Sequence, residues 1–277
     1  MVARVLRCLY VDLDGTLLGP GGSLLAGTGS AFALEGVRAL QACSRAEAEV
    51  VLYSGRRQSS VFEAARLLGC SAYIFELGCG LVLDGELQWL TDGVVPGGEG
   101  GSIYDQIEAS GAPALLLSRF EGRLEYHAPW AAGRDVSHLF RGSVELTAVG
   151  SVLEDAGLGW LRLVDNGVVR ESSGQMPGLA IVHAYHLIPT GASKARAVAR
   201  HMQARGYAGG DCIAVGDSRE DMDAAGVVGA FWLVANALAQ DPDLELEALA
   251  RAGVRVTIEE YGAGVYEAVV TTLAEGH

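Results

Sequence analysis

The amino-acid sequence predicts an α/β protein in which a Rossmann-like, doubly wound parallel sheet forms the core and an α+β cap domain is inserted into it. Three features of the 277-residue chain indicate this fold class. Short apolar runs that end in polar turns alternate with helix-like stretches near both ends, as in parallel sheets covered by helices. The middle of the chain instead carries paired strand-like runs around tight-turn signals, as antiparallel hairpins do. The length suits two domains of unequal size.

The core domain is expected from residues 1–80 together with residues 188–277. The apolar runs that we interpret as its strands cover residues 5–11, 50–53, 73–75, 212–215, 231–234 and 254–257. Helix-like stretches separate these runs, and the last of them places Val265, Val269 and Leu273 on one apolar stripe. This alternation of strands and helices predicts a parallel sheet.

The inserted α+β cap domain is expected over residues 81–187. The turn Asp84-Gly85-Glu86 separates two apolar runs, and Asp165-Asn166-Gly167 separates two more. Turn sequences of this kind favour β-hairpins. Helix-like patches at residues 103–109 and 144–153 lie between the hairpins, so the segment is of mixed class.

Charge and composition limit the classes of function. The chain has 34 acidic and 20 basic residues and a net charge of −14, so we expect no nucleic-acid partner. No segment approaches the roughly 20 uncharged apolar residues of a membrane helix, and we expect no membrane partner. The five cysteines are odd in number and form no C-x-x-C motif, which favours reduced thiols and a cytoplasmic protein.

Two acidic residues stand where the first predicted strand ends, in the turn Asp12-Leu13-Asp14-Gly15-Thr16. Open α/β sheets place their ligands at such strand ends. Carboxylates spaced in this way form a negative site that favours a hard cation, and Mg²⁺ would also hold a phosphate group. The alternative is a turn in which the acids and the glycine only end the strand.

The turn Ser54-Gly55-Arg56 and the side chain of Lys194 supply possible phosphate ligands. The serine hydroxyl and nearby backbone N–H groups could hold phosphate oxygens, although Ser-Gly turns are common. Lys194 is the only lysine among 20 basic residues. It falls in the first turn of a predicted helix, where a cation opposes the helix dipole and indicates a nearby anion. Chance placement of a single lysine is the alternative.

A further strand end carries the run Gly216-Asp217-Ser218-Arg219-Glu220-Asp221. Asp217 and Asp221 are candidates for the same cation site. Capping of the following helix by Asp217 or Ser218 is the alternative, since both residue types are common N-caps. Capping alone does not account for three acids within five residues.

In their order along the chain, these four motifs resemble those of the haloacid dehalogenase superfamily: D-x-D-G-T, a strand-end Ser or Thr, a helix Lys and G-D-x-x-x-D. The insertion between the second and third motifs is similar to the C2 cap class, and especially to that of the Cof-like, mannosyl-3-phosphoglycerate and sucrose-phosphate phosphatases. The resemblance covers residues 1–80 and 188–277. It implies a Mg²⁺-dependent phosphatase of a small phosphorylated metabolite.

The resemblance also implies roles for individual residues. Asp12 would be the nucleophile that becomes an aspartyl phosphate, and Asp14 would act as general acid and then as general base. The implied metal ligands are Asp12, Asp14 through its backbone carbonyl, and Asp217, with Asp221 supporting the water molecules on the metal. The implied phosphate ligands are Ser54, Gly55 and Lys194.

Two positions depart from the usual C2-cap motifs. Glu220 replaces an Asn of G-D-x-x-N-D, and Leu77 replaces the Asn of Glu-Asn-Gly. Both changes remove an amide near the expected substrate entrance, so the substrate of no single relative can be carried over. A sugar phosphomutase and a non-catalytic phosphometabolite-binding protein remain alternative functions. The acidic inserted segment favours a polar, sugar-sized substrate over a polyanion.

Overall fold

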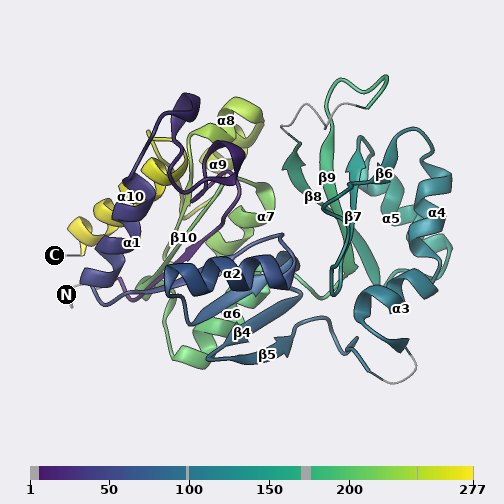
Figure 1. Ribbon diagram of the computed structural model, residues 1–277, viewed down its shortest axis with the longest axis horizontal. Coiled ribbons are helices and arrows are strands. Elements are labelled where there is room, and N and C mark those ends of the chain that lie inside the picture. The colour runs from purple at the N-terminus through teal and green to yellow at the C-terminus, as the bar shows by residue number, and fades with distance from the viewer. Residues whose placement is uncertain (1–5, 98–99, 170–175, 242, 277) are drawn as a thin grey trace.

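The structure, a computed structural model, describes residues 6–97, 100–169, 176–241 and 243–276. The described residues form one sheet of eight strands and a second sheet of four strands. The two sheets lie side by side, each with its own helices (Figure 1). In this part of the chain, no helix is both long and apolar enough to cross a membrane.

The large sheet carries the predicted parallel core. In chain order its strands are β1 (Cys8–Val11), β2 (Glu49–Tyr53), β3 (Ala72–Phe75), β4 (Gly80–Leu83), β5 (Glu86–Trp89), β10 (Cys212–Gly216), β11 (Ala230–Leu233) and β12 (Val254–Val256). Their spatial order is β12-β11-β10-β1-β2-β3-β4-β5. β1 pairs in parallel with both β2 and β10. The first strand was expected from Val5, which lies outside the described residues.

Helices cover both faces of this sheet, which confirms the doubly wound fold class. One face packs against α1 (Glu35–Arg45), α2 (Gln58–Leu68) and α10 (Tyr261–Glu275). The other packs against α6 (Lys194–Arg205), α7 (Arg219–Met222), α8 (Asn236–Gln240) and α9 (Asp243–Ala250). Successive side chains of β1 alternate between the two apolar cores: Leu9 and Val11 enter one, and Tyr10 enters the other.

The small sheet is antiparallel and forms the inserted cap. Its strands are β6 (Leu124–Tyr126), β7 (His138–Gly142), β8 (Leu161–Val168) and β9 (His183–Pro189), in the spatial order β6-β7-β9-β8. Three helices pack with it around a separate apolar core: α3 (Ile103–Ala109), α4 (Ala112–Arg119) and α5 (Leu146–Asp155). The predicted α+β class of the insertion is confirmed. The hairpin expected at Asp165-Asn166-Gly167 is wrong, because these residues lie within the single strand β8, at an irregularity in its pairing with β9.

The hairpin expected at the start of the insertion belongs to the large sheet. β4 pairs antiparallel with β3, and β5 extends the edge beyond it. Trp89 of β5 packs edge-on against Phe75 of β3, with ring centroids 5.8 Å apart. The turn sequence correctly predicted a hairpin, but this apolar contact attaches it to the core sheet. The domain limits at residues 81 and 187 remain a prediction.

Candidate active site

Asp12 lies directly after the central strand β1, at the carboxyl edge of the large sheet. Its backbone N–H donates to the Val215 carbonyl of β10 at 3.0 Å, and the residue is only 5% exposed. Burial raises the pKa of the Asp12 carboxyl well above its ordinary value; the Lys194 ammonium opposes this rise, and the Asp221 and Asp217 carboxylates add to it. A buried acid of this kind needs a cation beside it to ionise.

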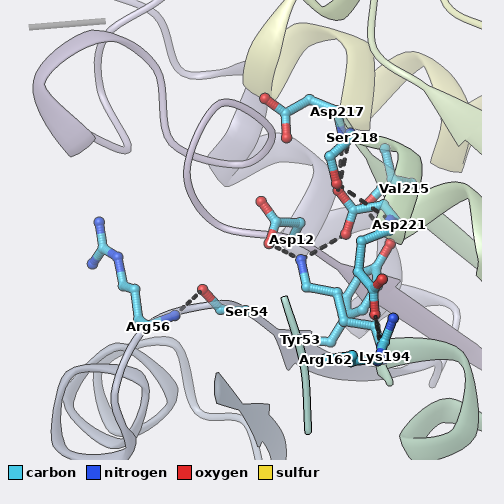
Figure 2. Close-up of polar contacts among 11 residues, drawn as sticks. Asp12, Tyr53, Ser54, Arg56, Arg162, Lys194, Val215, Asp217, Ser218 and Asp221 are labelled. Carbon is cyan, nitrogen blue, oxygen red and sulfur yellow. Dashed lines mark hydrogen bonds and ion pairs between the residues drawn. The ribbon is translucent and has the colours of Figure 1, made fainter. Parts of the chain in front are cut away.

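Lys194 provides one such cation. Its ammonium lies between two carboxylates, 2.8 Å from Asp12 Oδ1 and 2.6 Å from Asp221 Oδ1 (Figure 2). The side chain is 1% exposed and passes over the ring of Tyr53, with Nζ 5.0 Å from the centroid. Burial alone would lower the pKa of the ammonium, but the charges of Asp12 and Asp221 raise it above its ordinary value. Lys194 is therefore charged.

Two neighbouring residues fix the position of the start of α6, from which Lys194 contacts Asp12 and Asp221. Ser193 caps the helix, because its hydroxyl accepts a hydrogen bond from the Arg196 N–H at 3.1 Å. Gly78, after β3, lies directly against this cap: a Cβ atom there would sit 2.1 Å from the Ser193 carbonyl oxygen, and its φ is +87°. Only glycine combines this backbone conformation with so close an approach.

Asp221 is engaged by protein donors at both carboxylate oxygens. Oδ2 accepts from the N–H groups of Asp217 and Ser218, at 3.2 and 3.1 Å, and from the Ser218 hydroxyl at 2.7 Å. Oδ1 accepts from Lys194. Ser218 is the N-cap of α7, and with Asp221 it forms a reciprocal capping box. The capping alternative is thus correct for Ser218, while Asp221 combines capping with the contact to Lys194.

The acidic side chains are close enough to share a metal ion. One carboxylate oxygen of each of Asp12, Asp217 and Asp221 lies within 4.8 Å of the others. Oxygen donors that carry negative charge favour a hard divalent cation. The buried position of Asp12 and the raised pKa of its carboxyl make a cation favourable at this point. The donor set therefore fits a metal ion of the Mg²⁺ class.

A second group of possible metal ligands consists of Cys8, Glu49 and His201. It lies at the start of β1, at the other end of the strand from Asp12. Glu49 already accepts hydrogen bonds from the Arg205 guanidinium at 3.0 Å and from the Tyr207 hydroxyl at 2.9 Å. His201 Nε2 lies 3.6 Å from Glu49 Oε1. Because protein cations neutralise Glu49, this group needs no metal ion.

The turn after β2 lies beneath the cap. Ser54 is buried, and its hydroxyl oxygen accepts from the Arg56 N–H at 3.2 Å. Arg134 of the cap donates from Nη1 to the Gly55 carbonyl at 3.1 Å. The Asn166 side chain also lies over Gly55, where a Cβ atom would be 3.0 Å from Asn166 Nδ2. The cap thus contacts the proposed phosphate-binding turn directly.

Asp14 forms an ion pair that the sequence did not predict. Its two carboxylate oxygens accept from the Arg56 guanidinium, Oδ2 from Nε at 2.6 Å and Oδ1 from Nη2 at 2.5 Å. The guanidinium extends away from Asp12 (Figure 2). The two residues follow neighbouring strands, β1 and β2, and only their pairing in the sheet brings the side chains together. No local pattern could have identified the pair.

The two unusual positions, Glu220 and Leu77, both connect core and cap. Glu220 Oε1 accepts from the Lys194 backbone N–H at 3.3 Å and from Arg162 Nη2 of β8 at 3.5 Å. Leu77 is fully buried and belongs to the apolar core of the cap. The missing amides are therefore replaced by a carboxylate that holds the start of α6 and by an apolar anchor for the cap.

Glu76 is a structural residue that the sequence analysis missed. It is fully buried, and its carboxylate accepts from the backbone N–H groups of Asp135, Val136 and Ser137 at 2.8, 3.2 and 2.5 Å. Arg134 Nη1 lies 3.9 Å from the same carboxylate. Because these partners precede β7, Glu76 attaches the cap to the core sheet. The sequence signals were an acid next to an apolar run and its match to the Glu of Glu-Asn-Gly, to which no role was assigned.

Comparison with known proteins agrees with this architecture, although no family model matches the chain. A phosphoglycolate phosphatase from Pyrobaculum neutrophilum is 28% identical over 273 residues, which cover 98% of this chain and 97% of the relative. The sucrose-phosphatase of Synechocystis, solved with sucrose and phosphate, superposes with a TM-score of 0.64 at 15% identity and covers 96% of this chain and 98% of its own. A haloacid dehalogenase-like hydrolase from Bacteroides thetaiotaomicron gives 0.59 at 16% identity, with coverages of 96% and 98%.

The solved structures establish the fold, and the full-length relative is itself a phosphatase. The chain therefore has the fold of these structures, a Rossmann-like core with an inserted cap, and is similar in sequence to a phosphatase along nearly its whole length.

Proposed function

We propose that the protein hydrolyses a phosphomonoester of a small metabolite, a phosphorylated sugar or a related compound, in a Mg²⁺-dependent reaction with an aspartyl-phosphate intermediate on Asp12. The observation that carries this proposal is the Lys194 ammonium between Asp12 and Asp221, at 2.8 and 2.6 Å. It places a cation beside the buried carboxyl group of Asp12, at the edge of the sheet where ligands bind. The relatives named for phosphoglycolate and for sucrose phosphate support a small substrate.

In the first step a carboxylate oxygen of Asp12 attacks phosphorus. The bond between phosphorus and the leaving oxygen breaks, and the leaving oxygen keeps the electron pair of that bond. It also accepts a proton from the carboxyl group of Asp14. A water molecule then attacks the aspartyl phosphate, gives a proton to Asp14 and releases inorganic phosphate. Asp12 and Asp14 return to their starting forms, so the reaction balances as hydrolysis.

The metal ion would be held by the carboxylates of Asp12 and Asp217 and by the backbone carbonyl of Asp14. Both oxygens of Asp221 already accept protein hydrogen bonds, which suits it to orienting Lys194 and metal-bound water. A bound Mg²⁺ would offset the negative charge of the phosphoryl group.

The phosphoryl oxygens would be held by Ser54, Gly55 and Lys194. Ser54 is buried at the end of β2, and Gly55 follows it in the same turn. An ammonium and oriented donors at this point stabilise the charge that develops during transfer. We further propose a cytoplasmic enzyme, because the five cysteines are free thiols, as in a reducing compartment.

The test is a phosphate-release screen over sugar phosphates and short phosphorylated acids, with Mg²⁺ and with excess chelator. We expect release only with the metal, and Asp12→Asn should retain less than about a hundredth of the wild-type rate. Asp155→Asn, on the exposed end of α5, is the matched control and should be silent.

Full activity in chelator would exclude the metal mechanism. A tenth of the activity left in Asp12→Asn would remove Asp12 as nucleophile. Sugar bisphosphate-dependent isomerisation without free phosphate would indicate a mutase instead.

A further inference from the structure

The ion pair between Asp14 and Arg56 occupies the carboxylate that is proposed to protonate the leaving group. Asp12, Ser54 and Lys194 are the proposed contacts of the phosphoryl group, and Asp14 must reach the oxygen that leaves it. Both oxygens of the Asp14 carboxylate are, however, bound to the Arg56 guanidinium, at 2.6 and 2.5 Å. Asp14 can transfer a proton to a leaving oxygen only after it has given up at least one of these hydrogen bonds.

Separating the pair leaves a guanidinium that needs another anion. The Arg56 side chain is 32% exposed, and its Nε and Nη2 groups form a planar fork that two oxygens of one group can fill. A neutral hydroxyl offers one oxygen and no charge. A carboxylate offers two oxygens in the same plane, as Asp14 itself does, and charge-assisted bidentate contacts are about twice as strong as neutral ones. A carboxylate is therefore the group best able to replace Asp14.

We propose that Arg56 binds a carboxylate on the leaving group of the substrate, and that this carboxylate displaces Asp14 from Arg56 and frees it to act as acid and base. The preferred substrates are then short phosphorylated carboxylic acids. The inference rests on the proposed phosphatase function and, among small phosphorylated metabolites, favours acids over sugars. Binding of the carboxylate to Arg56 and release of Asp14 then occur together. A substrate without the carboxylate lacks the contact with Arg56 and also leaves Asp14 bound to Arg56.

The surroundings of the pair limit the size of such a substrate. Gly22, in the loop after β1, lies over the pair: a Cβ atom there would be 3.3 Å from Arg56 Nη2 and 3.9 Å from Asp14 Oδ1. On the cap side, Arg57 Nη1 donates to the Ala132 carbonyl at 3.0 Å. Asn166 lies over Gly55, next to Arg56 in the chain. These contacts surround the pair on the side of the β1 loop and on the side of the cap, so they favour a short leaving group over a bulky one.

The experiment compares substrates that differ only in the carboxylate. Phosphoglycolate is paired with hydroxyethyl phosphate, and phosphoglycerate with glycerol phosphate, and kcat/KM is measured for each with Mg²⁺. The wild-type enzyme should prefer the acid of each pair by at least about tenfold, which corresponds to about 1.4 kcal/mol. In Arg56→Gln this preference should fall to within about twofold, and Arg56→Lys should be intermediate because it keeps charge but loses the fork.

The matched control is Arg66→Gln. Arg66 also donates from Nε and Nη2 to a carboxylate, that of Glu63 on α2, but it belongs to no proposed site. It should keep the wild-type preference. Equal rates for acid and alcohol in the wild-type enzyme would overturn the proposal. So would an Arg56→Gln variant that lowers both rates by the same factor, because that is the effect of a purely structural residue.

A binding measurement separates this proposal from the phosphatase function. Calorimetry with Asp12→Asn and with Asp12→Asn/Arg56→Gln, using the same paired compounds, reports on Arg56 without turnover. One outcome is that the acids bind more tightly than the alcohols in an Arg56-dependent way, while the wild-type enzyme releases no phosphate. This result would support the carboxylate site and refute the proposed hydrolase activity. Phosphate release together with equal binding of acids and alcohols would support the hydrolase activity and refute the carboxylate site.

Discussion

Replacement of Lys194 by arginine tests whether the site needs a compact cation rather than a positive charge. The Lys194 ammonium is 1% exposed and donates to Asp12 Oδ1 and Asp221 Oδ1, which it approaches to 2.8 and 2.6 Å. A guanidinium keeps the charge but is wider and planar. It cannot take the same point between two carboxylates while leaving a donor for the phosphoryl group.

The size of the effect follows from these contacts. A hydrogen bond to a charged group contributes about 1.5–3 kcal/mol, and loss of one of the Lys194 contacts misplaces the nucleophile as well. We therefore expect Lys194→Arg to lower kcat by about two orders of magnitude, or about 2.7 kcal/mol. A purely electrostatic role would predict little change.

The assay is kcat at saturating substrate and Mg²⁺, with circular dichroism and urea unfolding to show that the variant is folded. Arg200→Lys is the matched control, because Arg200 lies on the exposed side of the same helix and donates to the neutral side chains of Gln88 and Gln203. It should be silent. Near-normal kcat in folded Lys194→Arg would refute the geometric argument and leave Lys194 as a general cation.

Two further predictions concern stability. Glu76→Gln should lower the free energy of unfolding in urea by about 2–3 kcal/mol, because the new amide cannot accept from all three N–H groups of residues 135–137. An unchanged urea midpoint would show that other contacts attach the cap. Burial would raise the pKa of Glu49, but the neighbouring His201 and hydrogen bonds from Arg205 and Tyr207 lower it from 4.5 to about 2. The stabilisation by Glu49 is therefore present above about pH 4.5 and lost as the pH falls through about 2. Glu49→Gln should cost about 3 kcal/mol near pH 6 and nothing near pH 2; a pH-independent difference would contradict this linkage.

The sequence predicted those parts of the site that are local. Asp12, Asp217 and Lys194 each stand at a strand end or helix start that apolar patterning marks, and their motifs place them at one edge of a parallel sheet. The Arg56 contact to Asp14 could not be predicted, because it joins two turns through the pairing of β1 with β2.

The same distinction applies to the fold. Turn chemistry predicted the β4–β5 hairpin, but hairpins pair with whichever sheet edge offers a matching apolar face. Here that face is provided by Phe75, which packs against Trp89. Glu76 was missed for a related reason: its partners lie about 60 residues further along the chain, and a buried acid in an apolar run has no periodic signature.

The central place of β1 also affects how the chain folds during synthesis. β1 can pair with β2 early, but its other neighbour, β10, is translated only after the whole inserted segment, since Cys8 faces Cys212. The small sheet, with all of its strands between residues 124 and 189, can form before the core is complete. Until β10 emerges from the ribosome, one edge of β1 stays open, and open edges recruit other chains. The nascent chain therefore passes through a long interval in which β1, a fully buried strand of the finished sheet, is paired on one side only, and chaperones that cover strand edges would act during that interval.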